Sequence, residues 1–195
     1  MSCDSWISLS IAIATFLAVI VALFGENIRN FWFGPKLSIA LSETPDLNTT
    51  HAGEKVWYYH LVVSNRHKAI ANNSVVMVTR VEELWDGGSR LLWHGEVPLS
   101  WMFGKESGVF YKNIGAKQYC DIISVGKQNG LSLKIRIHPN NLQSPWKQKM
   151  NLSITVYVKS DQYTTDEKKI TVNWDGEWDQ GEKEMSKHLS ISLQS

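Results

Sequence analysis

An apolar run near the N-terminus constrains this chain more than any other feature. From Ile7 to Phe24 the sequence reads ISLSIAIATFLAVIVALF, with hydroxyl groups only at Ser8, Ser10 and Thr15. Such hydroxyls can donate to the preceding helical turn, so a hydrocarbon environment tolerates them. A helix from about Ser5 to Asn30 would be about 39 Å long, which exceeds a bilayer core of about 30 Å. We therefore predict one transmembrane helix.

Aromatic residues flank the run on both sides. Trp6 precedes it, and Phe31, Trp32 and Phe33 follow it. Aromatic rings are enriched at the headgroup level of membranes, so we predict that these four residues lie at the membrane interface. A cleaved signal peptide fits less well, because no basic residue precedes the run and no small-x-small cleavage site follows it. A core helix of a soluble protein would show a polar face, and this run is apolar all round.

The charges beside the run predict its orientation. Asp4 lies on the N-terminal side, whereas Arg29, Lys36 and then Lys55 follow on the C-terminal side. The positive-inside rule then places the N-terminus outside and the rest of the chain in the cytoplasm. Cysteine use agrees with this, because Cys120 is the one cysteine after the run and secreted β domains often carry a disulfide.

The remainder of the chain predicts one globular domain. The 195 residues are 43% hydrophobic and 20% charged with a net charge of +1, which argues against a disordered tail and against a protein that binds nucleic acid polymers. About 160 residues suffice for one core but not comfortably for two. Gly34-Pro35 should end the helix, so we divide the chain into an anchor, 1–34, and a β domain, 35–195.

Short β-forming runs fill this domain and are separated by Gly, Pro, Asn or charged turns. The predicted strands are Lys36–Ser42, Val56–Ser64, Ser74–Leu84, Arg90–His94, Tyr119–Val125, Leu131–Ile137, Asn151–Ser160 and Lys168–Trp174. Asp86-Gly87-Gly88-Ser89 predicts a hairpin turn. No long amphipathic helices interleave, so the pattern predicts an all-β fold, an antiparallel sandwich rather than βαβ units.

Two further segments do not read as strands. Residues 104–117, GKESGVFYKNIGAK, predict a long ordered loop. Near the C-terminus, Trp178, Met185 and Leu189 recur at i, i+7 and i+11. This spacing predicts a short helix that seats them on the sheet, with Asp175 or Asp179 as its N-cap.

A resemblance adds to this interpretation. The segment YYHLVVSNRHKAIANNSVVMV resembles the second and third strands of immunoglobulin-like bacterial sandwich modules, in which a strand ending in V-x-N precedes a turn and an A-x-N-V/S-x-V strand. The whole chain resembles a family of uncharacterised bacterial single-pass membrane proteins, through Tyr58-Tyr59-His60-Leu61, Gly95-Glu96-Val97-Pro98-Leu99, Cys120-Asp121 and Trp174-Asp175-Gly176. The resemblance implies an immunoglobulin-like sandwich and brings no known activity.

Few residues point to catalysis or to metal binding. His60 lies in an apolar strand with Tyr58 and Val62 on its face, which predicts a structural role. His94 and Glu96 would share a face, but zinc needs three or four ligands. Nothing in the sequence marks the thiolate of Cys120 as stabilised, so we predict a buried, inert cysteine. We therefore predict no catalytic residue, no metal and no cofactor.

One basic loop is the candidate ligand site. Arg66, His67 and Lys68 follow the second predicted strand and could meet the phosphates of a nucleotide or of an anionic lipid. We expect a non-enzymatic protein-interaction module on the cytoplasmic face of a bacterial inner membrane, which binds the bilayer and either a partner protein or its own copies. One alternative is a membrane-bound effector that senses a small anionic ligand such as a nucleotide. The other is an extracytoplasmic binding domain.

Overall fold

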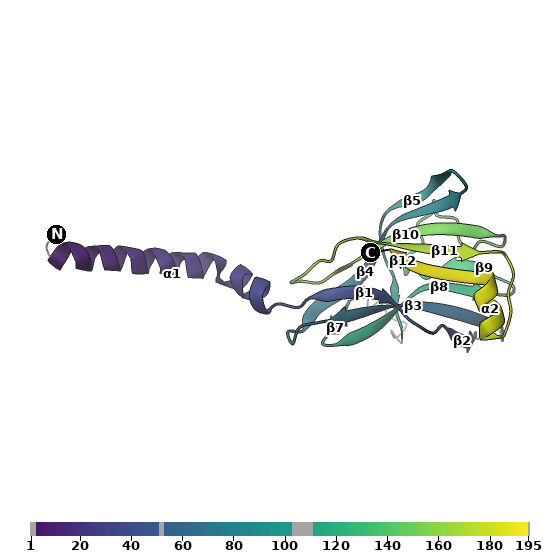
Figure 1. The fold of residues 1–195 in the computed structure, drawn as a ribbon, viewed down its shortest axis with the longest axis horizontal. Coiled ribbons are helices and arrows are strands. Elements are labelled where there is room, and N and C mark those ends of the chain that lie inside the picture. The colour runs from purple at the N-terminus through teal and green to yellow at the C-terminus, as the bar shows by residue number, and fades with distance from the viewer. Residues whose placement is uncertain (1–2, 51–52, 103–110, 195) are drawn as a thin grey trace.

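The computed structural model of the protein describes residues 3–50, 53–102 and 111–194 (Figure 1). Two helices and twelve strands occur in these ranges. They are α1 (Cys3–Phe33), β1 (Leu37–Leu41), β2 (Asp46–Thr49), β3 (Lys55–Asn65), β4 (Ala71–Trp85), β5 (Gly88–Pro98), β6 (Ser100–Trp101), β7 (Lys112–Ile114), β8 (Lys117–Gly126), β9 (Gly130–Leu133), β10 (Met150–Lys159), β11 (Lys168–Trp174), α2 (Glu182–His188) and β12 (Leu189–Gln194).

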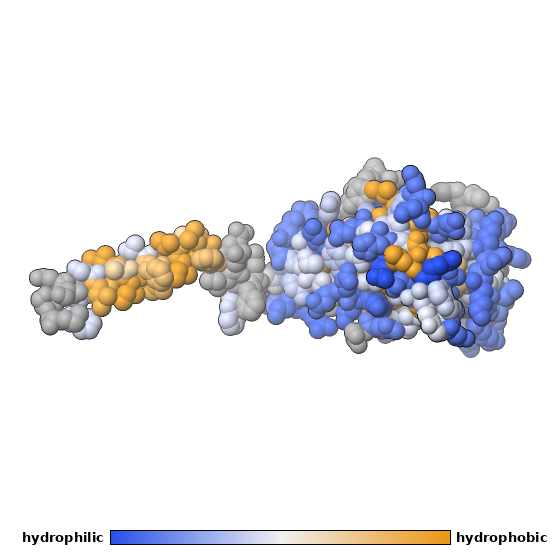
Figure 2. Space-filling view, turned by 90° about the horizontal axis from the view of Figure 1, so that it is seen from above, coloured by the Kyte–Doolittle hydropathy of each residue, from blue (hydrophilic) through white to orange (hydrophobic). Residues whose placement is uncertain are grey.

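Helix α1 projects away from the β domain (Figure 1). Its stretch Trp6–Gly25 is long and apolar enough to cross a membrane, and none of that stretch is buried within the protein. Figure 2 shows apolar residues along most of this stretch, in contrast to the mostly polar surface of the domain. The Ser10 and Thr15 hydroxyls donate to the carbonyls four residues earlier, at 2.8 and 2.9 Å, as their position in an apolar helix predicts.

The β domain consists of two antiparallel sheets. The first has the strand order β1-β3-β8-β6, with β2 also paired to β3 and β9 to β8. The second has the order β12-β11-β10-β4-β5, with β7 paired to the start of β4. The chain leaves the second sheet at the end of β5 and enters the first at β6, only one residue later. A domain of two antiparallel sheets, with an N-terminal apolar helix and a short C-terminal helix, was predicted.

One hydrophobic core lies between the sheets. Alternate residues of β3, such as Trp57, Leu61 and Val63, point into it, and β11 contributes Ile170 and Trp174 from the opposite sheet. This alternation follows from the two-residue period of a strand. Complete burial of such a side chain contributes about 1.5–3 kcal/mol, so the paired apolar faces dominate the stability of the domain.

Most predicted strands match the longer observed ones, and the segment Lys168–Trp174 was predicted to the residue. The predicted strand Leu131–Ile137 was too long, because β9 ends at Leu133. The hairpin between β4 and β5 was also predicted, and Gly87 takes a φ of 94° at its tip. Four short strands were missed, namely β2, β6, β7 and β12. β7 corrects part of the predicted loop 104–117, of which residues 104–110 lie outside the described residues.

The C-terminal helix also needs a correction. Helix α2 has Gly181 as its N-cap, rather than Asp175 or Asp179. The Asp179 carboxylate instead accepts a hydrogen bond from the backbone N–H of Gly181 at 2.7 Å, and Gly181 is the residue before the first residue of the helix, Glu182. Met185 and Leu189 are buried as predicted, but Leu189 already belongs to β12. The apolar spacing therefore marked two buried positions, Met185 and Leu189, and one partly buried position, Trp178, of which only Met185 lies within α2.

Candidate functional site

The predicted basic loop lies where α1 joins the β domain. Only Gly34, Pro35 and Lys36 separate α1 from β1, and the first two of these are buried. The ring Nδ1 of His67 lies 2.8 Å from the carbonyl oxygen of Gly34 and donates to it. The backbone N–H of Arg66 donates to the carbonyl of Lys36 at 2.9 Å. These bonds fasten the short connection between helix and domain to the loop.

Asn65, at the end of β3, organises this junction. Its side-chain oxygen accepts the backbone N–H of Lys36 at 3.2 Å and that of His67 at 3.1 Å. Its side-chain amide donates to the carbonyls of Ala69 and Ile114, at 2.6 and 3.0 Å. One asparagine thus connects the linker, the basic loop and β7. Asn65 is the asparagine of the V-x-N sequence, but no role was predicted for it.

The three predicted loop residues divide into two kinds. His67 is half-buried and serves the junction, whereas the Arg66 and Lys68 side chains are exposed. Within the described ranges, neither Arg66 nor Lys68 forms an ion pair with a carboxylate. Trp6, Trp32 and Phe33 are exposed on α1, and their placement at a membrane interface stays a prediction, while the side chain of Phe31 lies outside the described part of the structure.

His60 sits between two carboxylates, which the sequence did not predict. Its Nδ1 lies 2.8 Å from Asp121 Oδ1, on β8, and its Nε2 lies 3.1 Å from Asp46 Oδ2, on β2. His60 is 4% exposed. Burial alone lowers the pKa of His60, but the hydrogen bonds and negative charges of Asp121 and Asp46 outweigh burial and raise that pKa.

This arrangement favours a protonated imidazole rather than a catalytic base. When protonated, both ring N–H groups can donate, and each has a carboxylate in reach. A general base needs one free nitrogen directed at its substrate. His60 instead links β2, β3 and β8 through its side chain, consistent with the structural role expected of it. The sequence could not show the two partners, since they lie 14 and 61 residues away.

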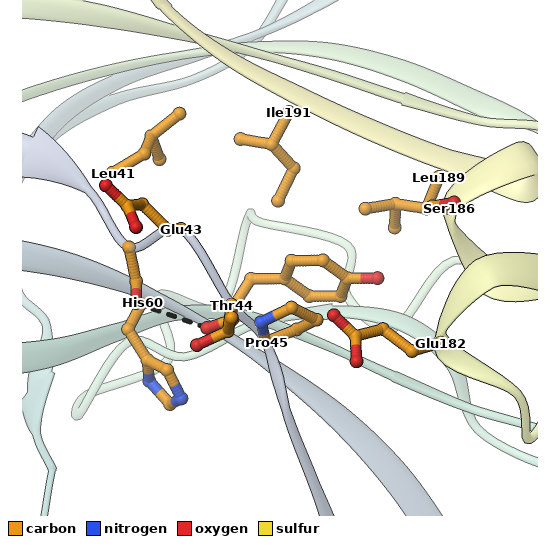
Figure 3. A pocket seen from close by; sticks show the side chains of 11 residues that line it. Leu41, Glu43, Thr44, Pro45, His60, Glu182, Ser186, Leu189 and Ile191 are labelled. Carbon is orange, nitrogen blue, oxygen red and sulfur yellow. Dashed lines mark hydrogen bonds between the residues drawn. The ribbon is translucent and has the colours of Figure 1, made fainter.

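A cleft opens on the side of the domain where β1 and β12 form the edges of the two sheets (Figure 3). We call it the edge cleft. Its volume is about 220 Å³. Leu41 of β1 and Ile191 of β12 lie across it, with Leu189 beside α2, and the imidazole of His60 points away from it (Figure 3). Leu41 and Ile191 pack on the core yet stay partly exposed, so the core is incompletely covered along this edge.

Acidic groups border the edge cleft. Glu43, in the β1–β2 loop, and Glu182, at the start of α2, lie on opposite sides of it (Figure 3). Both are exposed. Tyr59 also lines the cleft, and burial, helped by the charge of Glu182, raises the pKa of its phenol to about 12. The cleft therefore offers an apolar floor, a phenol that keeps its O–H at neutral pH and two acidic side chains, which suits a cationic and apolar occupant.

The remaining predicted candidates do not assemble into a larger site. Cys120 is buried, its thiol donates to the Ser100 carbonyl at 3.2 Å, and burial raises its pKa, which keeps it a thiol as predicted. Glu96, paired in the prediction with the exposed His94, accepts a bond from the Tyr157 hydroxyl at 3.0 Å. Over the described ranges, no group of three His, Cys, Asp or Glu residues is arranged to hold a metal ion.

Comparison with known proteins assigns no class to the fold or to these sites. A scan against protein-family models finds no match. A search of curated proteins finds no match either.

Proposed function

We propose that this chain is a membrane-anchored, non-enzymatic interaction module whose edge cleft binds an extended segment of a partner protein. In this proposal α1 is retained as a single transmembrane anchor, and the β domain lies on the cytoplasmic face of the inner membrane. The observation that carries the proposal is the partly exposed apolar core at the edge cleft, between two edge strands.

The strand order supports an immunoglobulin-like assignment. In immunoglobulin folds one sheet has strands A, B, E and D, and the other has G, F, C and, in variable-type domains, C′. The orders β1-β3-β8-β6 and β11-β10-β4-β5 reproduce these two sheets when the strands are lettered in chain order. β12 is then an additional strand beyond G. Domains of this architecture carry many unrelated functions, so the functional argument rests on the cleft.

The cleft suits a protein segment better than a nucleotide. Small-molecule sites commonly have volumes of about 300–1,000 Å³, and the edge cleft, at about 220 Å³, has room for one or two side chains. Among the described strands, β12 forms ladder pairs only with β11, so its other edge offers backbone groups for a further strand. A partner strand beside β12 could place an aliphatic side chain between Leu41 and Ile191. Lys or Arg beside that side chain would meet Glu43 or Glu182.

The described chemistry favours binding over catalysis. Both nitrogens of His60 face carboxylates, and the Cys120 thiol is buried and protonated. Neither group is therefore available as a base or nucleophile in the edge cleft. The cytoplasmic orientation is supported by the basic residues Arg66 and Lys68, which the fold brings beside the end of α1. A reporter fused to the C-terminus tests this orientation, and periplasmic reporter activity would overturn it.

The binding proposal can be tested with the full chain in nanodiscs and an array of short synthetic peptides. We expect the bound peptides to combine an aliphatic residue with a neighbouring Lys or Arg. The change Ile191→Thr should weaken binding because it removes part of the apolar floor. The double change Glu43→Lys and Glu182→Lys should weaken binding to basic peptides and slow their association, since it reverses the charges at the rim.

The matched control is Glu177→Lys with Glu184→Lys. Both residues are exposed and outside the edge cleft, and the net charge changes by the same amount. Thermal unfolding of each variant shows whether it folds. If folded cleft variants bind the selected peptides as well as the unaltered protein, the cleft is not the site. Peptide binding by the control pair should be unchanged. Tight binding of a nucleotide, weakened by changes at Arg66 and Lys68, would instead favour the ligand-sensing alternative.

A further inference from the structure

The end of the β domain next to α1 carries a group of exposed cations. Lys36 precedes β1, Arg66 and Lys68 lie in the β3–β4 loop, and Lys117 begins β8 opposite Ser64 of β3. All four side chains are exposed. We call these residues the basic collar. Ile70, two residues after Lys68, adds an apolar side chain that is 55% exposed.

Hydrogen bonds fix the collar at the base of α1. Lys36, Arg66 and the loop up to Ala69 are joined through Asn65 and through the Arg66–Lys36 backbone bond. Lys117 follows directly from Ala116, whose carbonyl accepts the Asn65 backbone N–H at 2.6 Å. Asp161 also reaches this end, where its carboxylate accepts the Asn73 side-chain amide at 2.7 Å. Within the described residues, the four collar cations outnumber this hydrogen-bonded carboxylate, so the collar carries a net positive charge.

Helix geometry places the collar near the headgroups. The apolar stretch of 20 residues, Trp6–Gly25, matches a hydrocarbon core of about 30 Å. The eight residues that follow Gly25, up to Phe33, add about 12 Å of helix. The headgroup layer on this side of the bilayer accounts for about 5–8 Å of that length. The collar then begins within about 8 Å of the headgroups, which is the distance over which charges interact at physiological salt. Tilting of the helix shortens this distance.

From this geometry we infer that the basic collar docks the β domain on anionic phospholipid headgroups of the bilayer that α1 crosses. The inference rests on the proposed anchoring role of α1. Docking would hold the membrane-proximal end of the domain against the bilayer and direct α2 and the edge cleft away from it (Figure 1). Each Lys or Arg near an anionic surface strengthens association by about fivefold, so loss of two collar residues should weaken docking by about 30-fold.

Spin labelling of the full chain in vesicles tests the inference. A label at Ile70→Cys, on a Cys3→Ser background, reports contact with the bilayer through its accessibility to oxygen relative to a water-soluble nickel complex. We expect contact in vesicles that contain phosphatidylglycerol and its loss in vesicles of phosphatidylcholine alone. High salt should reduce the contact, because it screens the charges. A label at Gln128→Cys, beyond β8 at the opposite end, should stay in water in both cases.

Charge variants identify the residues responsible. The double change Arg66→Glu and Lys68→Glu should abolish contact in anionic vesicles, and the milder Arg66→Gln with Lys68→Gln should weaken it by about 30-fold. Lys127→Glu with Lys183→Glu, which alters the same charge at the opposite end, should leave contact intact. The thermal unfolding of all variants should match that of the unaltered protein, since exposed charges contribute little to stability.

Three results would overturn the inference. The first is equal contact in neutral and anionic vesicles, and the second is full contact by a folded variant that lacks Arg66 and Lys68. In the third, inorganic phosphate stabilises the protein in neutral vesicles while anionic lipid has no effect, which would make free anions the ligand of the loop. Washing the vesicles with alkaline carbonate separates the premise from the inference. Release of the protein would contradict the anchoring role of α1, and the docking inference would fail together with it. Retention of the protein without contact between the collar and the bilayer would contradict the docking inference alone.

Discussion

Helix α1 and the β domain use the same apolar residue types in opposite ways. In α1, Ile11 is 62% exposed and Leu23 is 69% exposed, whereas Leu61 and Ile123 in the domain are fully buried. The strands alternate, so each sheet supplies an apolar face that the other sheet covers. The stretch Trp6–Gly25 of the helix is apolar all round and is not buried against the described part of the domain, so its surface suits a lipid environment. The comparison teaches that the period of the apolar residues, not their number, separates the two regions.

The largest effect should come from the core of the β domain. Trp174 is 2% exposed, and its indole N–H donates to the Glu177 carbonyl at 2.7 Å. Trp174→Ala should lower the free energy of unfolding by about 3–5 kcal/mol, through lost burial and the cavity that remains. Thermal unfolding followed by circular dichroism measures this. Trp85→Ala is the control, because Trp85 is 52% exposed and should contribute little. Equal losses for the two variants would contradict the assignment of Trp174 to the core.

The next effect should appear in α1 and leave the domain unchanged. Leu17 lies near the middle of the apolar stretch, and Leu17→Arg should cost about 2.5–3.5 kcal/mol of membrane insertion. The fraction of protein that resists alkaline extraction should fall, while Leu17→Ala should be retained. The thermal unfolding of the β domain should not change in either variant. If Leu17→Arg instead unfolds the domain, α1 packs on a protein surface and the comparison fails.

A smaller effect should appear where the two regions meet. Asn65→Ala leaves the Ala69 and Ile114 carbonyls without their side-chain donor, and should cost about 1–3 kcal/mol. Hydrogen exchange should then increase in the loop 66–70 and at the start of β1. Asn173→Ala is a matched control, since the exposed Asn173 makes one side-chain bond, to Ser190 at 3.4 Å. Unaltered exchange in Asn65→Ala would show that Asn65 does not organise the junction.

The smallest effect should be a pH dependence of the unfolding free energy, which arises from His60 on the outer side of β3. The pKa of His60 is raised in the folded protein, although burial opposes this, because Asp121 and Asp46 face both ring nitrogens. The protonated ring therefore stabilises the fold fully below its unfolded pKa of about 6.5, and this contribution is lost as the pH rises through the folded pKa. The unfolding free energy should thus fall with rising pH above about 6.5, and less so in His60→Gln. His94→Gln, at an exposed position, should keep the dependence of the unaltered protein.

Much of the fold could be predicted because the signals are local. The apolar run gave α1, and alternation gave the long strands β3, β4, β10 and β11. The short strands β2, β6 and β7 were missed because two to four residues carry no measurable period, and pairing with longer strands determines their conformation. β12 was missed because its first residue, Leu189, also completes the apolar spacing that predicted α2.

The candidate sites were less predictable, because their members come from distant parts of the chain. Arg66, His67 and Lys68 were selected as a charged run, but the run does not reveal that His67 binds Gly34 and only the other two remain exposed. His60 was recognised as structural without its partners Asp46 and Asp121. No sequence pattern predicts the edge cleft, because Leu41 and Ile191 are 150 positions apart in the sequence and come together only at the edges of two different sheets.

The sequence by itself therefore determined where the apolar side chains of each region are directed. Those of α1 cover its whole surface, which suits an apolar environment, and those of the strands lie on faces that pack against each other to form a core. Both features depend on the spacing of apolar residues along one segment, because that spacing alone decides which faces of a helix or a strand are apolar. Only the tertiary structure decided which side chains meet across the sheets, namely the Asn65 junction, the carboxylate partners of His60 and the edge cleft. Those contacts depend on the register and order of strands distant in sequence, and the free energy of the whole domain selects them together.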